Sequence, residues 1–489
     1  MPVPSCHATP FAPALAAVLA LAAAVRVIGL TFPFGDYDEG VYLATIRSVA
    51  HGFPLISQTY SSQGPLFVYL GQIFYCLSPT IASVRLFPVL CSLGVVRMAF
   101  GLLDRSLGRV AAVFASLYLA LDSAFLIVSR TFQVDIPWLA FSFASFCLLL
   151  RFHRTGRRRD VVGSAALFAV SVLLKANPLL VPVIIAYFLL SVPGRGLRSL
   201  TDLGWYLLLP VILLLAAVRP ADLAVFCADS VGSHAAHVGL TIDSWATGNR
   251  WLFLSYEFPV LLLDLVAAAG LAGGAYRSRN RLAAWLERSL PPVLALVWLA
   301  VTAVAFSLYH RLFPHHFVFL ILPAVLLAGD GARLGFDLLR GSRLGTTAWA
   351  AVLLTTIAYG AFFGGNSLVD ILRPQENRYD RTLASAAAYV RHTTAGDDYV
   401  VADDQIVLYL ADRNTPPNLV DTSFVRIESR ILTADDLAIS LRTYRPAVVA
   451  LVSGRLASMP GLSAVLAPDY TEHALENGAK VFRRRESAR

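Results

Sequence analysis

Charged residues are scarce in this chain of 489 residues. They make up 15% of the sequence, whereas 57% is hydrophobic and the mean hydropathy is +0.63. A soluble globular protein has about a quarter of its residues charged, while long apolar runs with charges at their ends are typical of lipid-embedded helices. The composition excludes a disordered chain and an ordinary soluble fold. It predicts a polytopic α-helical membrane protein.

Cysteine and lysine are also sparse. The five cysteines have no CxxC spacing and most lie within apolar runs, so neither a disulfide framework nor a zinc site is expected. Lysine occurs only at Lys175 and Lys480, so arginine carries nearly all of the net charge of +8. The arginines separate apolar runs instead of gathering on one face, which argues against a nucleic-acid partner.

Eleven apolar runs predict about eleven membrane spans. They lie at 11–31, 83–103, 110–128, 136–152, 161–174, 178–192, 203–218, 251–275, 290–309, 314–329 and 346–364. Every second loop is rich in arginine, and the positive-inside rule places those loops in the cytoplasm. We therefore expect a multi-pass protein of the cytoplasmic membrane with its N-terminus inside. The first run lacks the pattern of a signal peptide and is expected to be retained.

The segments between the arginine-rich loops are expected on the outer side. In the first outer loop, 32–82, the stretch 65–77 is apolar and aromatic but too short to span, which predicts a juxtamembrane helix. After residue 365 the composition changes to that of a soluble domain. We predict a transmembrane domain over 1–365 and an extracytoplasmic α/β domain over 366–489. The secondary structure expected there comprises helices at 382–392, 405–412 and 432–442, strands at 399–402 and 447–452, and a closing hairpin around Asn477-Gly478.

Three carboxylates follow the first predicted helix. Asp36, Asp38 and Glu39 lie within a few residues of one another at the expected outer surface. Crowding and partial burial raise the pKa of a carboxyl group, which would suit one of them to act as a general base. The same residues could instead cap a helix that begins at about Val41. Their spacing leaves both interpretations open.

Further ionisable residues lie at the outer ends of later runs. Asp135 precedes Pro137 and could act chemically or cap a helix. Arg130 lies where arginine is otherwise depleted, and it could snorkel, pair with Asp135 or contact an anion. Lys175 interrupts an apolar segment, where an ionisable group is costly. This favours a role such as phosphate binding, with a snorkelling lysine as the alternative.

The loop after the ninth run brings together His310, Arg311, His315 and His316. No HxxxH spacing accompanies them, so a metal site is not expected, and both an anion-binding rim and a solvated cluster fit. A carboxylate surrounded by cations suits the transfer of a group from a lipid phosphate. The cations would hold the phosphate, and the carboxylate would deprotonate an acceptor hydroxyl.

In the order of its motifs the chain resembles the GT-C membrane glycosyltransferases of the protein mannosyltransferase and aminoarabinose transferase type, which are glycosyltransferase family 39-like. The matching segments are DYDEGVYLATIRSVAHGFPL, QGPLFVYL, SRTFQVDIP, LLKANPLL and HHFVFLILP. The resemblance implies a polyprenyl-phosphate sugar as donor and inversion at the anomeric carbon. It also implies that neither a cofactor nor a divalent metal is needed.

The resemblance assigns roles by position. Asp38 matches the catalytic base, with Glu39 beside it, and Asp135 matches the second acidic residue. The chain departs from the pattern at Gln63-Gly64-Pro65, where the aminoarabinose transferases carry Lys-Pro-Pro, so other residues must hold the phosphate. The expected catalytic residues are Asp38, Glu39 and Asp135, and the expected substrate- or phosphate-binding residues are Lys175, Arg130, Arg311, His315, His316, Tyr60 and Gln63.

The leading hypothesis is an inverting glycosyltransferase that moves a hexose or pentose from a polyprenyl phosphate to an acceptor on the outer face of the cytoplasmic membrane. Its expected partners are membrane lipid, the lipid-linked sugar, and a glycan, lipid or protein acceptor. A transporter or flippase for a lipid-linked or anionic substrate is the main alternative, although the sequence shows no internal repeat. A scaffold that presents the C-terminal domain is a second alternative.

Overall fold

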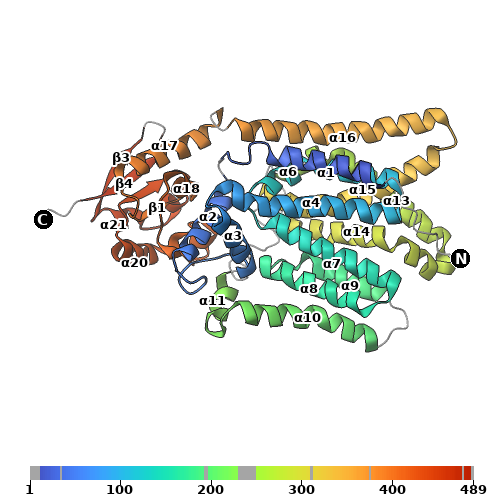
Figure 1. Cartoon of the computed structure of the whole chain (residues 1–489), viewed down its shortest axis with the longest axis horizontal. Coiled ribbons are helices and arrows are strands. Elements are labelled where there is room, and N and C mark those ends of the chain that lie inside the picture. The colour runs from blue at the N-terminus through green and yellow to red at the C-terminus, as the bar shows by residue number, and fades with distance from the viewer. Residues whose placement is uncertain are drawn as a thin grey trace.

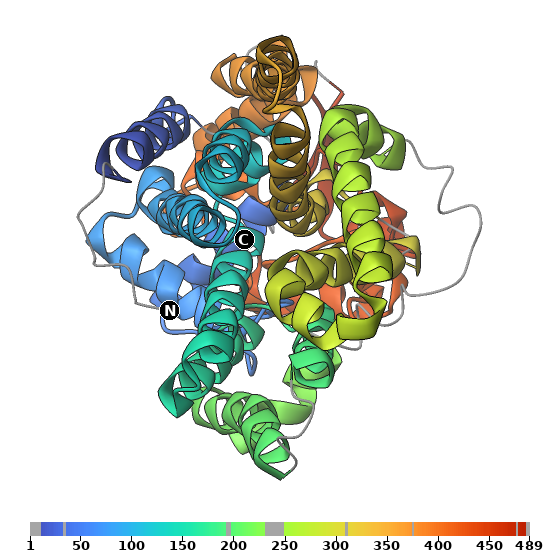
Figure 2. The same ribbon diagram turned by 90° about the vertical axis from the view of Figure 1, so that its right-hand side faces the viewer.

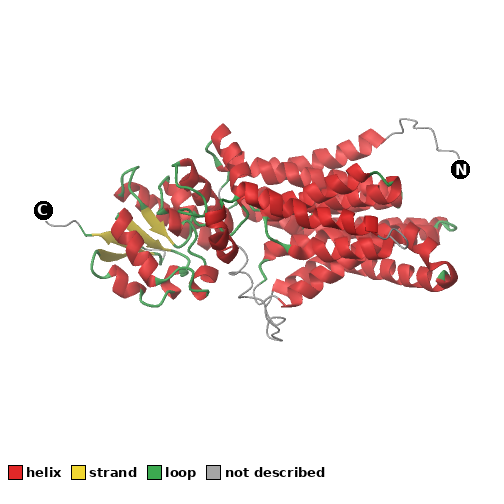
Figure 3. Cartoon of the chain, turned by 90° about the horizontal axis from the view of Figure 1, so that it is seen from below, coloured by secondary structure: helices red, strands yellow, loops and turns green. Residues whose placement is uncertain are grey.

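The structure, a computed structural model, describes residues 11–32, 36–191, 197–229, 249–308, 312–373, 376–475 and 478–485. Long helices form a bundle, and a smaller mixed part lies at one end of it (Figure 1). The strands are confined to that smaller part (Figure 3). The bundle helices are α1 (Phe11–Val27), α4 (Ile81–Ser106), α5 (Arg109–Leu121), α6 (Ser123–Arg130), α7 (Asp135–Thr155), α8 (Arg158–Leu174), α9 (Val181–Ser191), α10 (Leu197–Ala217), α13 (Asn249–Arg277), α14 (Leu282–Leu308), α15 (Val318–Leu339) and α16 (Arg343–Leu372).

Each of the predicted apolar runs coincides with helical structure. Within the described ranges, six helices are long and apolar enough to cross a membrane, or up to eight if each of two bent helix pairs is one span. One such pair is α5 and α6, which meet at 57° because Asp122 between them accepts the Phe125 amide at 2.7 Å and starts a new helix. The other joins α10 to α11 (Leu223–Cys227). The total of eleven spans stays a prediction.

Helix α15 is the most enclosed helix of the bundle. Its most apolar window is 89% buried, against 22% for α16, which runs along one edge (Figure 1). Small residues allow close helix packing: a Cβ at Gly331 would lie 2.2 Å from the Leu263 carbonyl oxygen of α13. Viewed end-on, the other helices are grouped around this packed centre (Figure 2). The residues at the ends of these helices are therefore held in place by a tightly packed core.

Two helices of the first outer loop, α2 (Tyr37–Ala50) and α3 (Pro65–Leu77), lie between the bundle and the mixed part (Figure 1). The predicted juxtamembrane stretch is confirmed as a helix, α3. Its Phe67 ring is buried and stacks on Phe132 at a centroid distance of 4.6 Å, whereas its Leu77 is exposed. Helix α2 begins one turn before the predicted start at Val41, because the Asp36 carboxylate accepts the Glu39 amide at 2.8 Å and caps it.

The C-terminal part is a four-stranded mixed sheet with helices. Strand order is β1-β2-β4-β3; β1 and β2 are parallel, and β4 is antiparallel to both of its neighbours. The strands and helices predicted here are confirmed, as is the β3–β4 hairpin, although Asn477 at its tip lies outside the described residues. Its elements are α17 (Arg378–Thr393), β1 (Val400–Ala402), α18 (Ile406–Ala411), α19 (Phe424–Glu428), α20 (Ala434–Tyr444), β2 (Val448–Leu451), α21 (Leu462–Leu466), β3 (Tyr470–Ala474) and β4 (Lys480–Arg484).

A glycine in α2 sets the distance between the first outer loop and the C-terminal part. A Cβ at Gly40 would lie 2.6 Å from the backbone nitrogen of Ile406, at the start of α18. Backbone atoms cannot move aside as a flexible side chain can, so α2 approaches α18 this closely only without a side chain here. The contact fixes α2, and with it the residues at its N-terminal end, against the C-terminal part.

We expect Gly40→Ala to lower the free energy of unfolding by about 1–3 kcal/mol, the usual cost of overpacking a tight contact. The matched control is Gly94→Ala in α4, where an added Cβ meets nothing within 4 Å and alanine is the better helix former. Thermal unfolding of both purified variants in detergent measures the difference. Equal melting temperatures for Gly40→Ala and the wild type would contradict the close approach of α2 to α18.

Candidate functional site

A cavity of about 340 Å³ lies where the loops at one end of the bundle meet the C-terminal part. Its walls come from α2, the loop before α3, the start of α7, the end of α8, the turn before α15 and the C-terminal part. The lining residues are Asp36, Tyr37, Asp38, Val41, Tyr42, Tyr60, Ser62, Gln63, Asp135, Lys175, Phe313, Pro314, His315, His316, Asp421, Ser423, Phe424, Val425 and Arg455. The structure therefore brings together most of the predicted site residues.

Asp38 lies in the first turn of α2, and 36% of its side chain is exposed. The Nε2 atom of His315 is 3.6 Å from its Oδ2 atom. Desolvation in the cavity, followed by the nearby carboxylates of Asp135 and Asp421, raises the pKa of Asp38 to about 6. A carboxyl group with this pKa is ionised at neutral pH and still accepts a proton readily, as a general base must.

Asp36 has a different task from Asp38, although both line the cavity. Its carboxylate caps α2 and also accepts a hydrogen bond from Nε2 of Gln133 at 2.7 Å. Burial, and then the negative charges of Asp38 and Glu39, raise the pKa of Asp36 to about 7. One Asp36 oxygen caps α2 and the other binds Gln133, so Asp36 is a structural element of the site.

Asp135 and Lys175 form an ion pair on the bundle side of the cavity. Helix α7 begins at Asp135 and α8 ends just before Lys175, so the antiparallel helices bring both residues to the same end. The Lys175 Nζ atom lies 2.7 Å from Oδ1 of Asp135 and 5.4 Å from the centre of the Phe319 ring. An ammonium group has three donors, so the bond to Asp135 does not exhaust it.

The histidines lie in the short 3-10 helix Pro314–Phe317 that leads into α15. His315 faces Asp38, whereas Nδ1 of His316 accepts the Phe313 amide at 3.3 Å and the two imidazole rings pack edge to face at 4.3 Å. Arg311, predicted to bind phosphate, lies outside the described residues. Among the residues that the structure describes, no group of three or more His, Cys, Asp or Glu side chains is placed to hold a metal ion.

Two further residues of the predicted set, Tyr60 and Gln63, line the cavity from the loop before α3. The Arg426 guanidinium of the C-terminal part lies 3.6 Å from the centre of the Tyr60 ring, which is a cation–π contact. Gln63 is buried and also lines a second, smaller cavity. Both residues therefore contribute to the walls that a ligand would contact.

Glu39 and Arg130, by contrast, do not line the cavity. Glu39 is fully buried and binds Arg85 of α4 through both carboxylate oxygens, with Arg85 Nε 2.7 Å from Oε1. Adjacent residues in a helix point about 100° apart. Asp38 therefore faces the cavity, whereas Glu39 faces the bundle. Arg130 is also buried, and its guanidinium donates to the carbonyl oxygens of Val25 and Ile28 near the end of α1.

A second cavity of about 150 Å³ adjoins the first and shares with it Ser62, Gln63, Lys175 and His316. Its remaining lining is mostly apolar: Ala176, Asn177, Pro178, Leu179, Ala305, Phe306, Leu312 and Phe319. Lys175 thus lies between a polar compartment and an apolar one. This arrangement fits an amphiphile with an anionic head.

The C-terminal part contributes residues to the site that no sequence motif predicted. Arg455 lies with its guanidinium 3.7 Å from the centre of the Tyr37 ring and 3.5 Å from the Asp404 carboxylate. The Tyr37 hydroxyl donates to Asp421 at 2.9 Å and accepts the Thr422 amide at 2.9 Å. One signal was available: Asp404 and Arg455 follow β1 and β2, and the carboxyl ends of parallel strands are common ligand sites.

Comparisons with known proteins concern the family and the fold of the chain. Residues 62–220 match the family model described as dolichyl-phosphate-mannose-protein mannosyltransferase. Among solved structures, ArnT from Cupriavidus metallidurans bound to undecaprenyl phosphate is similar with a TM-score of 0.63 at 16% identity, covering 97% of this chain and 99% of that one. The GT-C resemblance is confirmed.

Other structures share the GT-C fold with this chain. The Archaeoglobus fulgidus oligosaccharyltransferase is similar with a TM-score of 0.57 at 14% identity, covering 96% of this chain and 73% of that one. Mycobacterial arabinofuranosyltransferase AftD has a TM-score of 0.50 at 17% identity, covering 95% of this chain and 41% of that one. A search of curated proteins found no match. At these identities the likeness of the solved structures concerns the fold.

We expect Arg85→Met to lower the free energy of unfolding by about 3–5 kcal/mol, because it leaves the Glu39 carboxylate buried without its partner. Arg373→Gln is the matched control: it breaks an ion pair with Glu376 in which the two side chains are 62% and 73% exposed, and such pairs contribute about 0–1 kcal/mol. Thermal unfolding in detergent measures both. A melting temperature for Arg85→Met as high as that of the control would show that the Glu39–Arg85 pair does not hold α2.

Proposed function

We propose that the protein is an inverting glycosyltransferase that moves a sugar from a polyprenyl phosphate to an acceptor on the outer face of the cytoplasmic membrane. One observation carries the proposal. Asp38, whose pKa is raised and whose carboxylate faces His315, lies in a polar cavity with Lys175 and Arg455, and that cavity adjoins an apolar one. The donor implied by this pairing has a phosphate, a sugar and a lipid tail.

The donor is proposed to lie across both cavities. Its phosphate is held by Lys175, where the two cavities meet, and the first units of its tail occupy the space lined by Phe306 and Phe319. The similar ArnT structure was solved with undecaprenyl phosphate, which supports a lipid of this class. No metal is assigned to the phosphate, since Lys175 and the nearby Arg455 supply positive charge at the polar end.

In the proposed reaction an acceptor hydroxyl attacks the anomeric carbon on the face opposite the phosphate. The new carbon–oxygen bond forms as the bond to the phosphate oxygen breaks, and the phosphate leaves with the bonding electrons. Asp38 takes the proton of the acceptor hydroxyl, so its carboxylate becomes neutral as the phosphate gains charge. A single displacement of this kind inverts the anomeric configuration.

We propose that the C-terminal part forms one wall of the active site. Tyr37 is held at its hydroxyl by Asp421 and at its ring by Arg455, so the residue next to Asp38 is fixed from the C-terminal side. His315, at 3.6 Å from Asp38, orients the carboxylate or shares its proton. These contacts hold the base within hydrogen-bonding reach of an acceptor that enters between α2 and the C-terminal part.

We expect Asp38→Asn to insert and fold normally but to lose transfer by about 10²–10⁴-fold, the usual contribution of a general base. The measurement is the release of free polyprenyl phosphate from a radiolabelled lipid-linked sugar in proteoliposomes. Glu39→Gln is the matched control, because it alters the adjacent carboxyl group, which lies outside the cavity. Its activity should fall only in proportion to the amount of folded protein. Near-normal turnover by Asp38→Asn would contradict the assignment of the base. Wild-type movement of the intact donor across the bilayer without cleavage would favour a flippase.

We expect transfer to require the ionised form of Asp38. Because the pKa of this group is raised to about 6, kcat/KM should fall about tenfold per pH unit below pH 6 and level off above it. The Asp421 carboxylate contributes to the raised pKa, so Asp421→Asn should move the acid limb to lower pH, while Asn still accepts the Tyr37 hydrogen bond. The check is a pH profile of single-turnover transfer. A limb that shifts to higher pH, or no limb down to pH 4, would refute this electrostatic account.

A further inference from the structure

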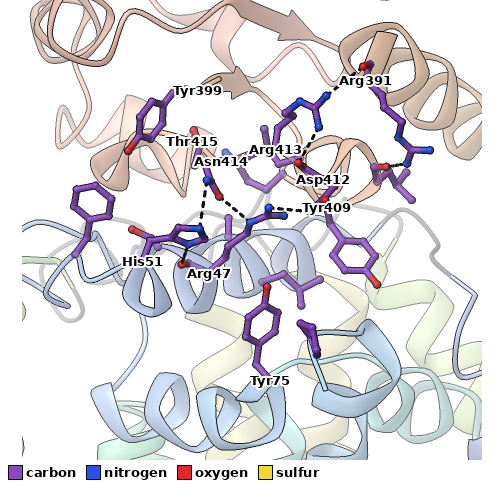
Figure 4. Close-up of a pocket in the computed structure, with 18 residues that line it drawn as sticks. Arg47, His51, Tyr75, Arg391, Tyr399, Tyr409, Asp412, Arg413, Asn414 and Thr415 are labelled. Carbon is purple, nitrogen blue, oxygen red and sulfur yellow. Dashed lines mark hydrogen bonds and ion pairs between the residues drawn. The ribbon is translucent and has the colours of Figure 1, made fainter. Parts of the chain in front are cut away.

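A larger cavity, of about 620 Å³, lies between the C-terminal half of α2 and the C-terminal part (Figure 4). Among the described residues it shares no lining side chain with the cavity that contains Asp38. Both cavities border α2: residues between Tyr37 and Tyr42 line the Asp38 cavity, and the larger cavity is lined from Leu43 onward. The proposed transfer reaction does not involve this larger cavity, which we call the α2 rear cavity.

The α2 rear cavity is lined chiefly by cationic, amide and aromatic groups. Arg47 and His51 come from α2, Tyr75 from α3, and Arg391 from α17, while Arg413, Asn414 and Thr415 follow α18. The acidic residue among its lining residues is Asp412, whose side chain is 80% exposed. With Arg47, Arg391 and Arg413 on its walls, the cavity has an excess of positive charge. Its volume is within the range of about 300–1,000 Å³ usual for small-ligand sites.

Part of this lining is a fixed frame. The Arg413 guanidinium is buried and donates to Thr394 and to the backbone carbonyl oxygens of Arg391, Ala411 and Asp412. Arg47 is pre-positioned as well: its Nε donates to Asn414 at 2.8 Å, and its Nη2 lies 2.8 Å from Asp412 (Figure 4). Guanidinium groups held in this way lose little conformational freedom when a ligand binds.

Several polar atoms of the lining have no protein partner in the described part of the chain. Oε1 of Gln405 and Oγ1 of Thr415 are buried without a hydrogen bond. The hydroxyl groups of Tyr75 and Tyr399 also make none there, and Figure 4 shows these two rings on different sides of the Arg47–Asn414 pair. The Tyr75 and Tyr399 side chains are only partly buried, so their hydroxyl groups are open to a polar molecule in the cavity.

The chemistry of the walls selects the class of ligand. A sugar ring presents C–H faces that pack on aromatic rings and hydroxyl edges that bind amide and phenol groups. The lining offers Tyr75, Tyr399 and Phe53 for the faces and Asn414 for the edges. The arginine excess adds a preference for an acidic substituent, because a guanidinium group binds a carboxylate or phosphate through paired hydrogen bonds.

We propose that the α2 rear cavity binds an acidic oligosaccharide. We further assign it, on the basis of the proposed function, to the part of a glycan acceptor that is remote from the reacting hydroxyl. Asp38 and Arg47 are nine residues apart on one helix, which is about 13 Å along its axis. A chain of a few sugars covers this distance around α2. The cavity would then select the acceptor while the Asp38 cavity performs the transfer.

The test is a direct binding measurement on the purified full-length protein. Isothermal titration calorimetry is carried out with tetragalacturonate as the acidic probe and maltotetraose as the neutral one. We expect tetragalacturonate to bind at least tenfold more tightly, with an affinity that falls as salt is added. Arg391→Gln and Arg47→Gln should each weaken its binding about tenfold, the size expected for one lost charge-assisted hydrogen bond. Arg381→Gln, on the exposed side of α17, is the matched control and should bind like the wild type.

Arg47→Gln also removes contacts within the protein, so two variants that each lack only a hydroxyl group control for loss of folded protein. Tyr75→Phe and Tyr399→Phe remove groups without protein partners, so they should keep the melting temperature and weaken binding severalfold. Equal affinity for both probes, no binding of tetragalacturonate, or unchanged binding in Arg391→Gln and in both tyrosine variants would each overturn the proposal. Asp38→Asn should bind the probe normally. If that variant also retained transfer, the proposed catalytic role would fail while the binding site remained.

Discussion

The candidate active site depends on the buried ion pair between Glu39 and Arg85. Arg85 binds Glu39 through two contacts and also donates to the carbonyl oxygens of Leu30 and Phe32, just after α1, at 2.8 Å each. Glu39 in turn accepts the Phe132 amide at 2.7 Å, near the start of α7. One pair therefore joins α1, α2, α4 and the α6–α7 connection. Such a pair is costly to desolvate, and its network of hydrogen bonds makes the position of α2 specific.

This anchoring explains why neighbouring acids differ in role. Asp36 caps the helix, Asp38 faces the cavity and Glu39 faces the bundle, because successive helical positions diverge by about 100°. The cluster looked uniform in the sequence, where capping and catalysis were equally compatible with it. The structure assigns capping to Asp36 and leaves Asp38 as the carboxylate that lines the cavity next to His315 and Lys175.

How far the sequence could predict the site depended on the distance between partners along the chain. Apolar runs located the bundle helices, and charges at outer helix ends pointed to Asp38, Asp135 and Lys175, since these features are local. Glu39 and Arg130 were assigned to the site because the sequence does not reveal their actual partners. Glu39 pairs with Arg85, 46 residues away, and Arg130 donates to carbonyl oxygens near the end of α1, about 100 residues away. Arg455 carried no motif of its own, and only the fold places it over Tyr37.

The stacking of Arg455 on Tyr37 also sets an order of events during biosynthesis. Tyr37 and Arg455 lie 418 residues apart in the chain (455 − 37), and translation at about 5–20 residues per second separates them by tens of seconds. During that interval the helices around Asp38 are already in the membrane, while the cavity still lacks a wall. A nascent chain without the C-terminal part therefore lacks this wall, and the candidate site is complete only when that part has folded.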